Sequence, residues 1–380
     1  MLELQDVFTR FGAEYRSTHF LSSQEFKAMD AIESCRTNKL GGHKDVCDSC
    51  DNMKISYNSC GNRNCPKCGN IGKEQWILAR NSEILPVTYF HTVFTVPHIL
   101  NPLFLANKEV MYSLLFKAAW DTLAKLALDK KHLGAQIGVT MVLHTWGQNL
   151  SFHPHVHCII PGGGLSLSGN SFVHSKKKFF IHVRIISKEF RKVFLALLAK
   201  EFHAGSLSFA GECITWEDEQ EFTSQTDALS RLKWVVYCKK PFKNSYNIVE
   251  YLSRYTHKTA IYNNRLVSMD DSKVTFRWRD YKDANKVKLL TLDAMEFIRR
   301  FLMHVLPSGF QKIRYYGILS CRCRKTKLAR CFKLNGLPAP KKVKLTAKEL
   351  ILKVFGVDIS VCPLCGGNWV SCSSLQPSSG

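Results

Sequence analysis

The chain has 380 residues, of which 53 are Lys or Arg and 31 are Asp or Glu, so its formal net charge at pH 7 is +22. This length exceeds that of a usual single hydrophobic core and predicts two or three domains. The excess of positive charge is spread along the chain and favours a polyanionic partner, most often nucleic acid, over simple solubility. No apolar stretch is long enough to span a bilayer and the N-terminus has no signal-peptide core, so we expect an intracellular, cytoplasmic protein without a membrane partner.

Cysteines near the N-terminus have the spacing of zinc ligands. Fifteen cysteines in a reducing compartment predict metal binding before disulfides. Cys47 and Cys50 form one CxxC pair and Cys65 and Cys68 a second, and two such pairs can complete a closed shell of four sulfurs around one ion. We therefore expect a structural zinc in an N-terminal DNA-recognition module, residues 1–85. Three nearby residues could substitute as ligands or bind a second zinc: Cys35, His43 and Cys60.

Residues 86–265 alternate between strand-like and helix-like patterns, and we expect one domain there. Their order of strand, helix, strand, strand, helix, strand is that of a ferredoxin-like or RRM-like antiparallel sheet with helices on one face. This order predicts the α+β class. The strands are expected at 87–96, 136–146, 153–160 and 234–238, and the helices at 104–128 and 187–202.

The third of these strands carries the motif HPHVH, residues 153–157. Because residues i and i+2 of a strand point to the same face, His155 and His157 offer two imidazoles side by side. A single histidine here would most simply satisfy hydrogen bonds, but two on one face favour a metal or general-base site. His144, just before the connecting turn, is the preferred third ligand, and Gln148 in that turn is the next candidate.

A helix is predicted where Tyr251 and Tyr255 occur, and at this spacing they stack on one face. Two tyrosines on a helix face usually pack into a core. Three features favour chemistry instead: the preceding metal site, the basic chain, and the neighbouring Arg254 and Lys258, which suit phosphate. A divalent metal that polarises a phosphodiester would make attack by a phenol feasible, and the product would be a covalent phosphotyrosine.

The last third of the chain, residues 266–380, is expected to be a basic region. A strand near 273–279 alternates apolar and cationic residues, so its cationic face either follows the DNA backbone or is a solvated sheet surface. The candidate DNA-binding residues are Arg277 and Arg279 in this strand, together with Arg265, the last residue of the preceding domain. Near the end, Cys362 and Cys365 form half of a zinc knuckle, for which the candidate partners are Cys321, Cys323 and Cys331.

Four stretches resemble the two-tyrosine HUH transposases of the insertion sequence ninety-one family: CRTNKLGGH with the CxxC pairs, HTWGQNLSFHPHVHCIIPGGGLS, EYLSRYTHKTAIYNNRL and LPSGFQKIRYYG. The resemblance covers nearly the full chain. It implies that His155 and His157 are ligands of Mg or Mn, that Tyr251 and Tyr255 are paired nucleophiles, and that zinc is structural. It also implies cleavage and rejoining of single-stranded DNA at element ends during rolling-circle transposition, on the nucleoid of a bacterium. The chain has no GxxxxGK phosphate loop, so host replication or helicase proteins are expected to unwind the DNA.

Two other functions stay open at this point. The chain could be a non-catalytic zinc-ribbon DNA-binding protein in which the histidines and tyrosines only pack. It could also be a plasmid replication initiator or a relaxase with the same chemistry, which the genetic context of the gene would discriminate. The joint occurrence of paired histidines and paired tyrosines favours the transposase.

Overall fold

The computed structural model describes residues 2–176, 180–242, 248–249, 251, 256, 259–281, 283–341 and 345–378. Its helices are α1 (Leu4–Thr18), α2 (Ser23–Ser34), α3 (Gly69–Asn81), α4 (Asn101–Ala106), α5 (Lys108–Leu128), α6 (Val183–His203), α7 (Glu219–Arg231), α9 (Ala294–Leu302), α10 (Ala329–Leu334) and α11 (Ala347–Phe355). Its strands are β1 (Gly42–Cys47), β2 (Met53–Tyr57), β3 (Tyr89–Thr95), β4 (Ala135–Gln136), β5 (Gly138–Trp146), β6 (Phe152–Pro161), β7 (Gly163–Ser166), β8 (Phe172–His174), β9 (Val236–Phe242), β10 (Leu266–Met269), β11 (Lys273–Asp280), β12 (Lys286–Asp293), β13 (Ile313–Gly317) and β14 (Trp369–Leu375). Among these helices, none combines the length and apolar character that a bilayer crossing requires.

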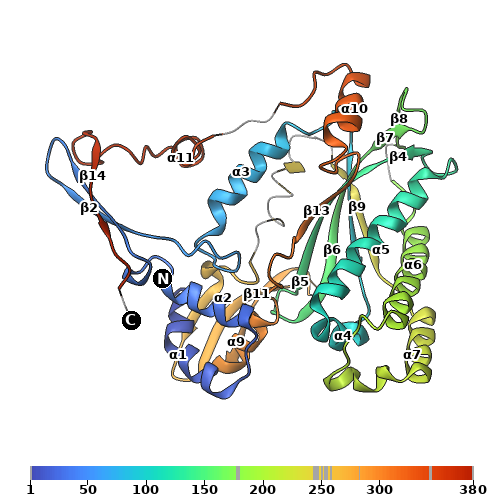
Figure 1. The fold of residues 1–380 in the computed structure, drawn as a ribbon, viewed down its shortest axis with the longest axis horizontal. Helices are drawn as coiled ribbons and strands as arrows, with labels where there is room; N and C mark the ends of the chain where they lie inside the picture. The colour runs from blue at the N-terminus through green and yellow to red at the C-terminus, as the bar shows by residue number, and fades with distance from the viewer. Residues whose placement is uncertain are drawn as a thin grey trace.

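The central sheet has five strands in the order β13-β5-β6-β3-β9, and its neighbouring strands are antiparallel (Figure 1). Along the chain, β3, α5, β5, β6, α6 and β9 follow the predicted order of strand, helix, strand, strand, helix, strand. The prediction of an α+β fold with an antiparallel sheet is confirmed. The edge strand β13 was not predicted. It ends at Gly317, where φ is +59° and a Cβ atom would collide with the carbonyl oxygen of Ile137, so this close approach requires glycine.

The two faces of the central sheet differ because side chains alternate along each strand. Phe90, Met141 and Val156 point to one face and belong to the main hydrophobic core. The helices α5 and α6 complete this core and lie next to each other beside the sheet (Figure 1). The residues between these apolar positions therefore point to the opposite face, where polar side chains can gather.

A second hydrophobic core joins the N-terminal helices to residues from the last third of the chain. Phe8 of α1 meets Phe301 of α9 edge to face at 5.4 Å between ring centroids. Phe276 of β11 meets Phe297 of α9 in the same way at 5.7 Å. The helices α1 and α2 thus pack on α9 and on the sheet β10-β11-β12, although almost the whole central sheet lies between them in sequence.

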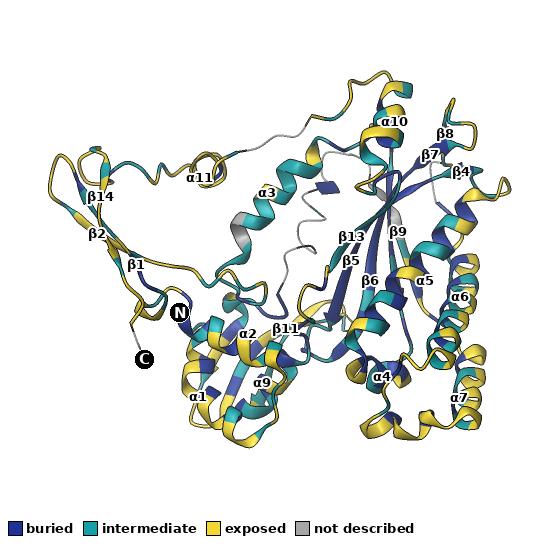
Figure 2. Cartoon of the chain, in the orientation of Figure 1, coloured by how far each residue is buried: buried dark blue, intermediate teal, exposed yellow. Residues whose placement is uncertain are grey.

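A third sheet, of order β14-β1-β2, forms an extended arm at one side of the molecule (Figure 1). Gly42 of β1 pairs with Tyr57 of β2 on one side and with Leu375 of β14 on the other. Most residues of β2 and β14 are exposed, whereas β5 and β6 are mostly buried (Figure 2). The C-terminal segment thus returns to the N-terminal part of the chain and completes its sheet.

A buried histidine beside the central sheet makes stability depend on pH. The ring of His304 contacts the Thr145 hydroxyl at 3.2 Å and the Leu150 carbonyl oxygen at 3.2 Å, and burial lowers the pKa of His304 to about 3. Below pH 6.5 the unfolded chain takes up a proton that folded His304 does not. We expect this residue to lower the free energy of unfolding by up to about 1.4 kcal/mol per pH unit as the pH falls.

Urea denaturation at several pH values between about 6.5 and about 5.5 measures this slope. The His304→Leu variant lacks the titrating ring and should therefore show a shallower slope than the wild-type protein. Equal slopes in the two proteins would contradict the expectation.

Candidate active site and metal centres

Three histidines converge on the sheet face opposite α5 and α6. In the register of β5 and β6, His144 lies directly opposite His155, and Val142 lies opposite His157. The ring centroids are 5.5 Å apart for His144 and His155, 4.6 Å for His144 and His157, and 4.9 Å for His155 and His157. One nitrogen of each ring lies within 4.8 Å of the others, which suits a single divalent cation.

A hydrogen bond orients the ring of His155, and a ring stack orients that of His144. Nδ1 of His155 lies 2.7 Å from the carbonyl oxygen of His153, so Nδ1 carries the hydrogen and Nε2 keeps the lone pair for a metal. His144 is buried and stacks on Trp146 with centroids 4.8 Å apart. Gln148, the alternative third ligand from the sequence, instead donates its amide hydrogen to the Tyr281 hydroxyl. The three imidazoles fit a cation and are the residues that would hold it.

A fourth histidine, which the sequence analysis did not single out, connects this group to a tyrosine. His91 of β3 is buried, and its Nε2 lies 2.9 Å from Nδ1 of His157. Its Nδ1 lies 3.0 Å from the hydroxyl oxygen of Tyr251. The sequence could have indicated this residue. Neighbouring residues of a strand point to opposite faces, so His91 points away from the face of Phe90 and Thr92. The predicted residues Tyr255, Arg254 and Lys258 lie outside the described residues.

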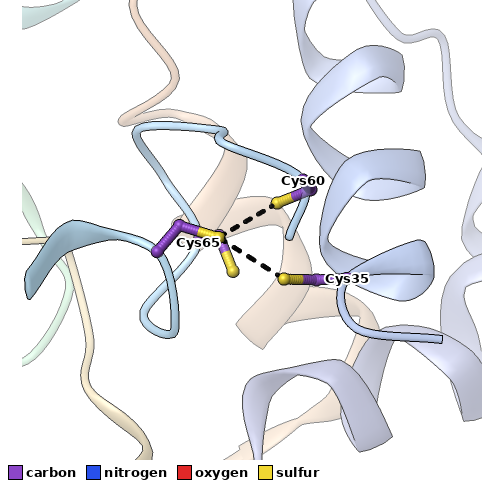
Figure 3. A group of neighbouring side chains, drawn as sticks. Cys35, Cys60 and Cys65 are labelled. Atoms are coloured by element: carbon purple, nitrogen blue, oxygen red, sulfur yellow. Dashed lines mark hydrogen bonds between the residues drawn. The ribbon is translucent and has the colours of Figure 1, made fainter. Parts of the chain in front are cut away.

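One group of four cysteines ties α2 to the loops before α3. Its members are Cys35, Cys60, Cys65 and Cys68. The thiols of the first three point toward one another (Figure 3). Sγ of Cys68 lies 3.4 Å from that of Cys35 and 3.6 Å from that of Cys60. A zinc–sulfur distance of about 2.3 Å places tetrahedral sulfurs about 3.8 Å apart, so these four thiols fit a zinc ion.

A second group of four cysteines joins the two ends of the chain. Cys47 and Cys50, at the β1–β2 turn, meet Cys362 and Cys365, which precede β14. The Sγ atoms are 3.4 Å apart for Cys47 and Cys365 and 3.8 Å apart for Cys50 and Cys362. The pairing of β1 with β14 brings these residues together.

This grouping corrects the cysteine arrangement expected from the sequence. The predicted shell of Cys47, Cys50, Cys65 and Cys68 does not form, because the β1–β2 hairpin carries the first CxxC pair away onto the arm. His43 joins neither group and lies 3.4 Å from an Asp45 oxygen. Three cysteines proposed as partners of the C-terminal pair also lie outside both groups: Cys321, Cys323 and Cys331.

The arginines near β11 differ in burial: one is partly buried and donates to the backbone, and two are exposed. Arg265 donates to the backbone oxygens of Arg277 and Gln148, and burial lowers its pKa to about 10. Its guanidinium therefore joins the turn after β5 to β11. Arg277 and Arg279 are exposed and lie two residues apart on one face of β11, where cations suit phosphate contact.

Comparisons with known proteins define the class. A family described as a putative transposase matches residues 138–327, which contain the three histidines and Tyr251. A family described as a transposase zinc-binding domain matches residues 7–96, which contain the first cysteine group. The protein is thus a transposase with an N-terminal zinc-binding domain.

Two relatives extend the match over almost the whole chain. The putative transposase y4qJ of Sinorhizobium fredii is 44% identical over 368 residues, which cover 96% of this chain and 92% of that protein. The transposase for insertion sequence element IS801 of Pseudomonas savastanoi pv. phaseolicola is 27% identical over 360 residues, covering 93% of this chain and 84% of that protein. No solved structure matches. The chain belongs to the two-tyrosine transposases of the IS91 family, as its motifs predicted.

The second cysteine group can be tested by the zinc content of the protein. Changing Cys362 and Cys365 to serine leaves the first group intact, so we expect bound zinc to fall from two ions to one per chain. Elemental analysis of the desalted protein measures this content. The matched control changes the exposed cysteines Cys321 and Cys372 to serine and should keep both ions. An unchanged zinc content in the first variant would contradict the second site.

Proposed function

We propose that this transposase cleaves and rejoins single-stranded DNA at the ends of its insertion sequence through a 5′-phosphotyrosine. The observation that carries the proposal is the contact between Tyr251 and the histidine group. The Tyr251 hydroxyl lies 3.0 Å from His91, which lies 2.9 Å from His157. The proposed nucleophile thus lies next to the proposed metal ligands at one face of the sheet, and this closeness supports transfer of a phosphoryl group there.

In the proposed mechanism, His144, His155 and His157 hold one Mg²⁺ or Mn²⁺ on a ferredoxin-like HUH sheet. When bound, such a cation polarises a phosphate oxygen and absorbs developing charge. The Tyr251 hydroxyl loses its proton to solvent as its oxygen bonds to the phosphorus. The bond from phosphorus to the 3′ oxygen breaks, and that oxygen takes up a proton to become the 3′ hydroxyl that primes replication. Tyr255 would cut the second strand or the target. Because the phosphotyrosine conserves the bond energy, the strands rejoin without ATP.

The remaining parts of the chain have proposed roles in holding DNA. Residues 1–85 would recognise element ends with structural zinc, residues 86–265 would form the endonuclease, and residues 266–380 the basic region. Cationic side chains would neutralise phosphates along the DNA backbone. The proposed contacts are Arg254, Lys258, Arg277 and Arg279. Unwinding would come from host replication or helicase proteins on the bacterial nucleoid in the cytoplasm.

The test is capture of the covalent product. The purified protein is incubated with labelled single-stranded element-end DNA and Mg²⁺ or Mn²⁺, and the products are separated on a denaturing gel. We expect a protein-linked band in the wild type and none when Tyr251 and Tyr255 are both changed to phenylalanine. Tyr237→Phe, at an exposed position on β9, is the matched control and should keep the band.

The other outcomes separate the alternatives. Binding of DNA without a covalent band, with several end sequences and both metals, would favour a non-catalytic zinc-ribbon protein. A covalent band on plasmid origin DNA but not on element ends would favour a replication initiator or relaxase.

A further inference from the structure

We propose that His91 is a positioning residue that couples the metal ligand His157 to the nucleophile Tyr251. The inference rests on the proposed function, because it assigns a role within that site. His91 is 1% exposed and lies on the same sheet face as the three proposed ligands. Its two ring nitrogens contact two different groups: Nε2 the His157 ring, and Nδ1 the Tyr251 hydroxyl.

The register of β3 and β6 explains why His91 reaches His157. Val93 lies directly opposite His157, and His91 lies opposite Ile159. His91 and His157 are therefore diagonal neighbours, a spacing that ring side chains can bridge. The two rings are nearly parallel, with an interplanar angle of 17° and centroids 5.1 Å apart. The contact is a product of strand pairing between residues that are 66 positions apart.

The chemistry of imidazole makes the two contacts dependent on each other. Nδ1 of His157 faces His91, so a metal would be bound through Nε2 of His157, and Nδ1 would then carry the hydrogen. That hydrogen is donated to Nε2 of His91. A neutral imidazole has one donor and one acceptor nitrogen, so Nδ1 of His91 must donate to the Tyr251 oxygen. Binding of a metal by His157 thus determines which hydrogen bond the Tyr251 oxygen accepts.

The same arrangement orients the nucleophile. The rings of His91 and Tyr251 meet edge to face, with centroids 5.4 Å apart and an interplanar angle of 72°. A hydrogen bond from Nδ1 holds the Tyr251 oxygen at a set distance from the metal ligands, and a positioned nucleophile reacts faster than a freely rotating one. His91 would touch neither DNA nor metal, and would act through His157 and Tyr251.

Three substitutions at His91 separate its two contacts. The amide of glutamine reaches about as far as Nε2, so His91→Gln keeps a partner for His157. The amide of asparagine reaches about as far as Nδ1, so His91→Asn keeps a partner for Tyr251. His91→Phe fills the space and removes both partners. His203→Gln, at an exposed position at the end of α6, is the matched control.

Two measurements are made on each zinc-loaded protein. Mn²⁺ affinity is measured by electron paramagnetic resonance without DNA, and the rate of covalent complex formation is measured at saturating Mn²⁺. Loss of a residue that orients a metal ligand typically costs about 10–100-fold in metal affinity or activity, and we expect His91→Phe to lose this much in both. His91→Gln should keep Mn²⁺ affinity close to the wild type and lose rate. His91→Asn should lose affinity and keep more of the rate at saturating Mn²⁺.

Wild-type affinity and rate in His91→Phe would overturn the inference. Equal losses in all three variants, with a lowered unfolding midpoint, would also overturn it and identify a packing role. If the wild type binds Mn²⁺ but forms no covalent complex, the proposed function fails. In that case the Mn²⁺ affinities alone decide whether His91 positions His157. A loss of Mn²⁺ affinity in His91→Phe but not in His91→Gln would support this role, and any other pattern would overturn it.

Discussion

Changing both His155 and His157 to alanine is expected to lower the rate of DNA cleavage by about 10³-fold or more. A bound cation supplies several kcal/mol of stabilisation to a developing phosphoryl charge, and about 4 kcal/mol corresponds to this factor. The two residues provide two of the three converging imidazoles, so their removal leaves His144 alone. The rate of covalent complex formation, measured over a range of Mn²⁺ concentrations, gives the effect.

The matched control for this experiment changes His174 and His203, two exposed histidines outside the converging group, to alanine. This variant should keep the wild-type rate. Both zinc ions should be retained in both variants, because the cysteine groups lie elsewhere. Cleavage at the wild-type rate without His155 and His157 would refute the assignment of the metal site.

The largest expected effect on stability comes from the first cysteine group. Changing Cys35 and Cys65 to serine should remove one zinc ion and lower the unfolding midpoint by on the order of 10 °C or more. Structural zinc sites contribute roughly 10 kcal/mol of binding free energy, and each kcal/mol moves the midpoint of a large domain by about 2–4 °C. Cys35 and Cys65 are buried in the core that α1 and α2 share with α9, so the loss should spread to these helices.

Scanning calorimetry and elemental analysis together measure this effect. Changing Cys321 and Cys372 to serine, which are exposed and belong to neither group, should leave the midpoint and the zinc content unchanged. A chelator that strips zinc should bring the wild type close to the Cys35→Ser, Cys65→Ser variant and change that variant less. A full complement of zinc in the double variant would contradict the site.

The sequence by itself determined the family and the α+β class, and it supplied the candidate residues of the site. The period of two along the HPHVH strand predicted that His155 and His157 share a face, and their ring centroids are 4.9 Å apart. The motifs around these histidines and around Tyr251 predicted the two-tyrosine transposases, and the relatives confirm that family. Such inferences succeed because they depend on residues close together in the chain, where backbone geometry relates spacing directly to direction.

Only the tertiary structure decided which distant residues meet. Cys47 and Cys50 meet Cys362 and Cys365 because β14 pairs with β1, and no local spacing encodes that pairing. His91 reaches His157 only through the register of two strands that are far apart in sequence. Ligand spacing shows that a cysteine pair can hold half a zinc site, but the free energy of packing the whole chain selects the other half, because loop closure costs little more for long loops than for short ones.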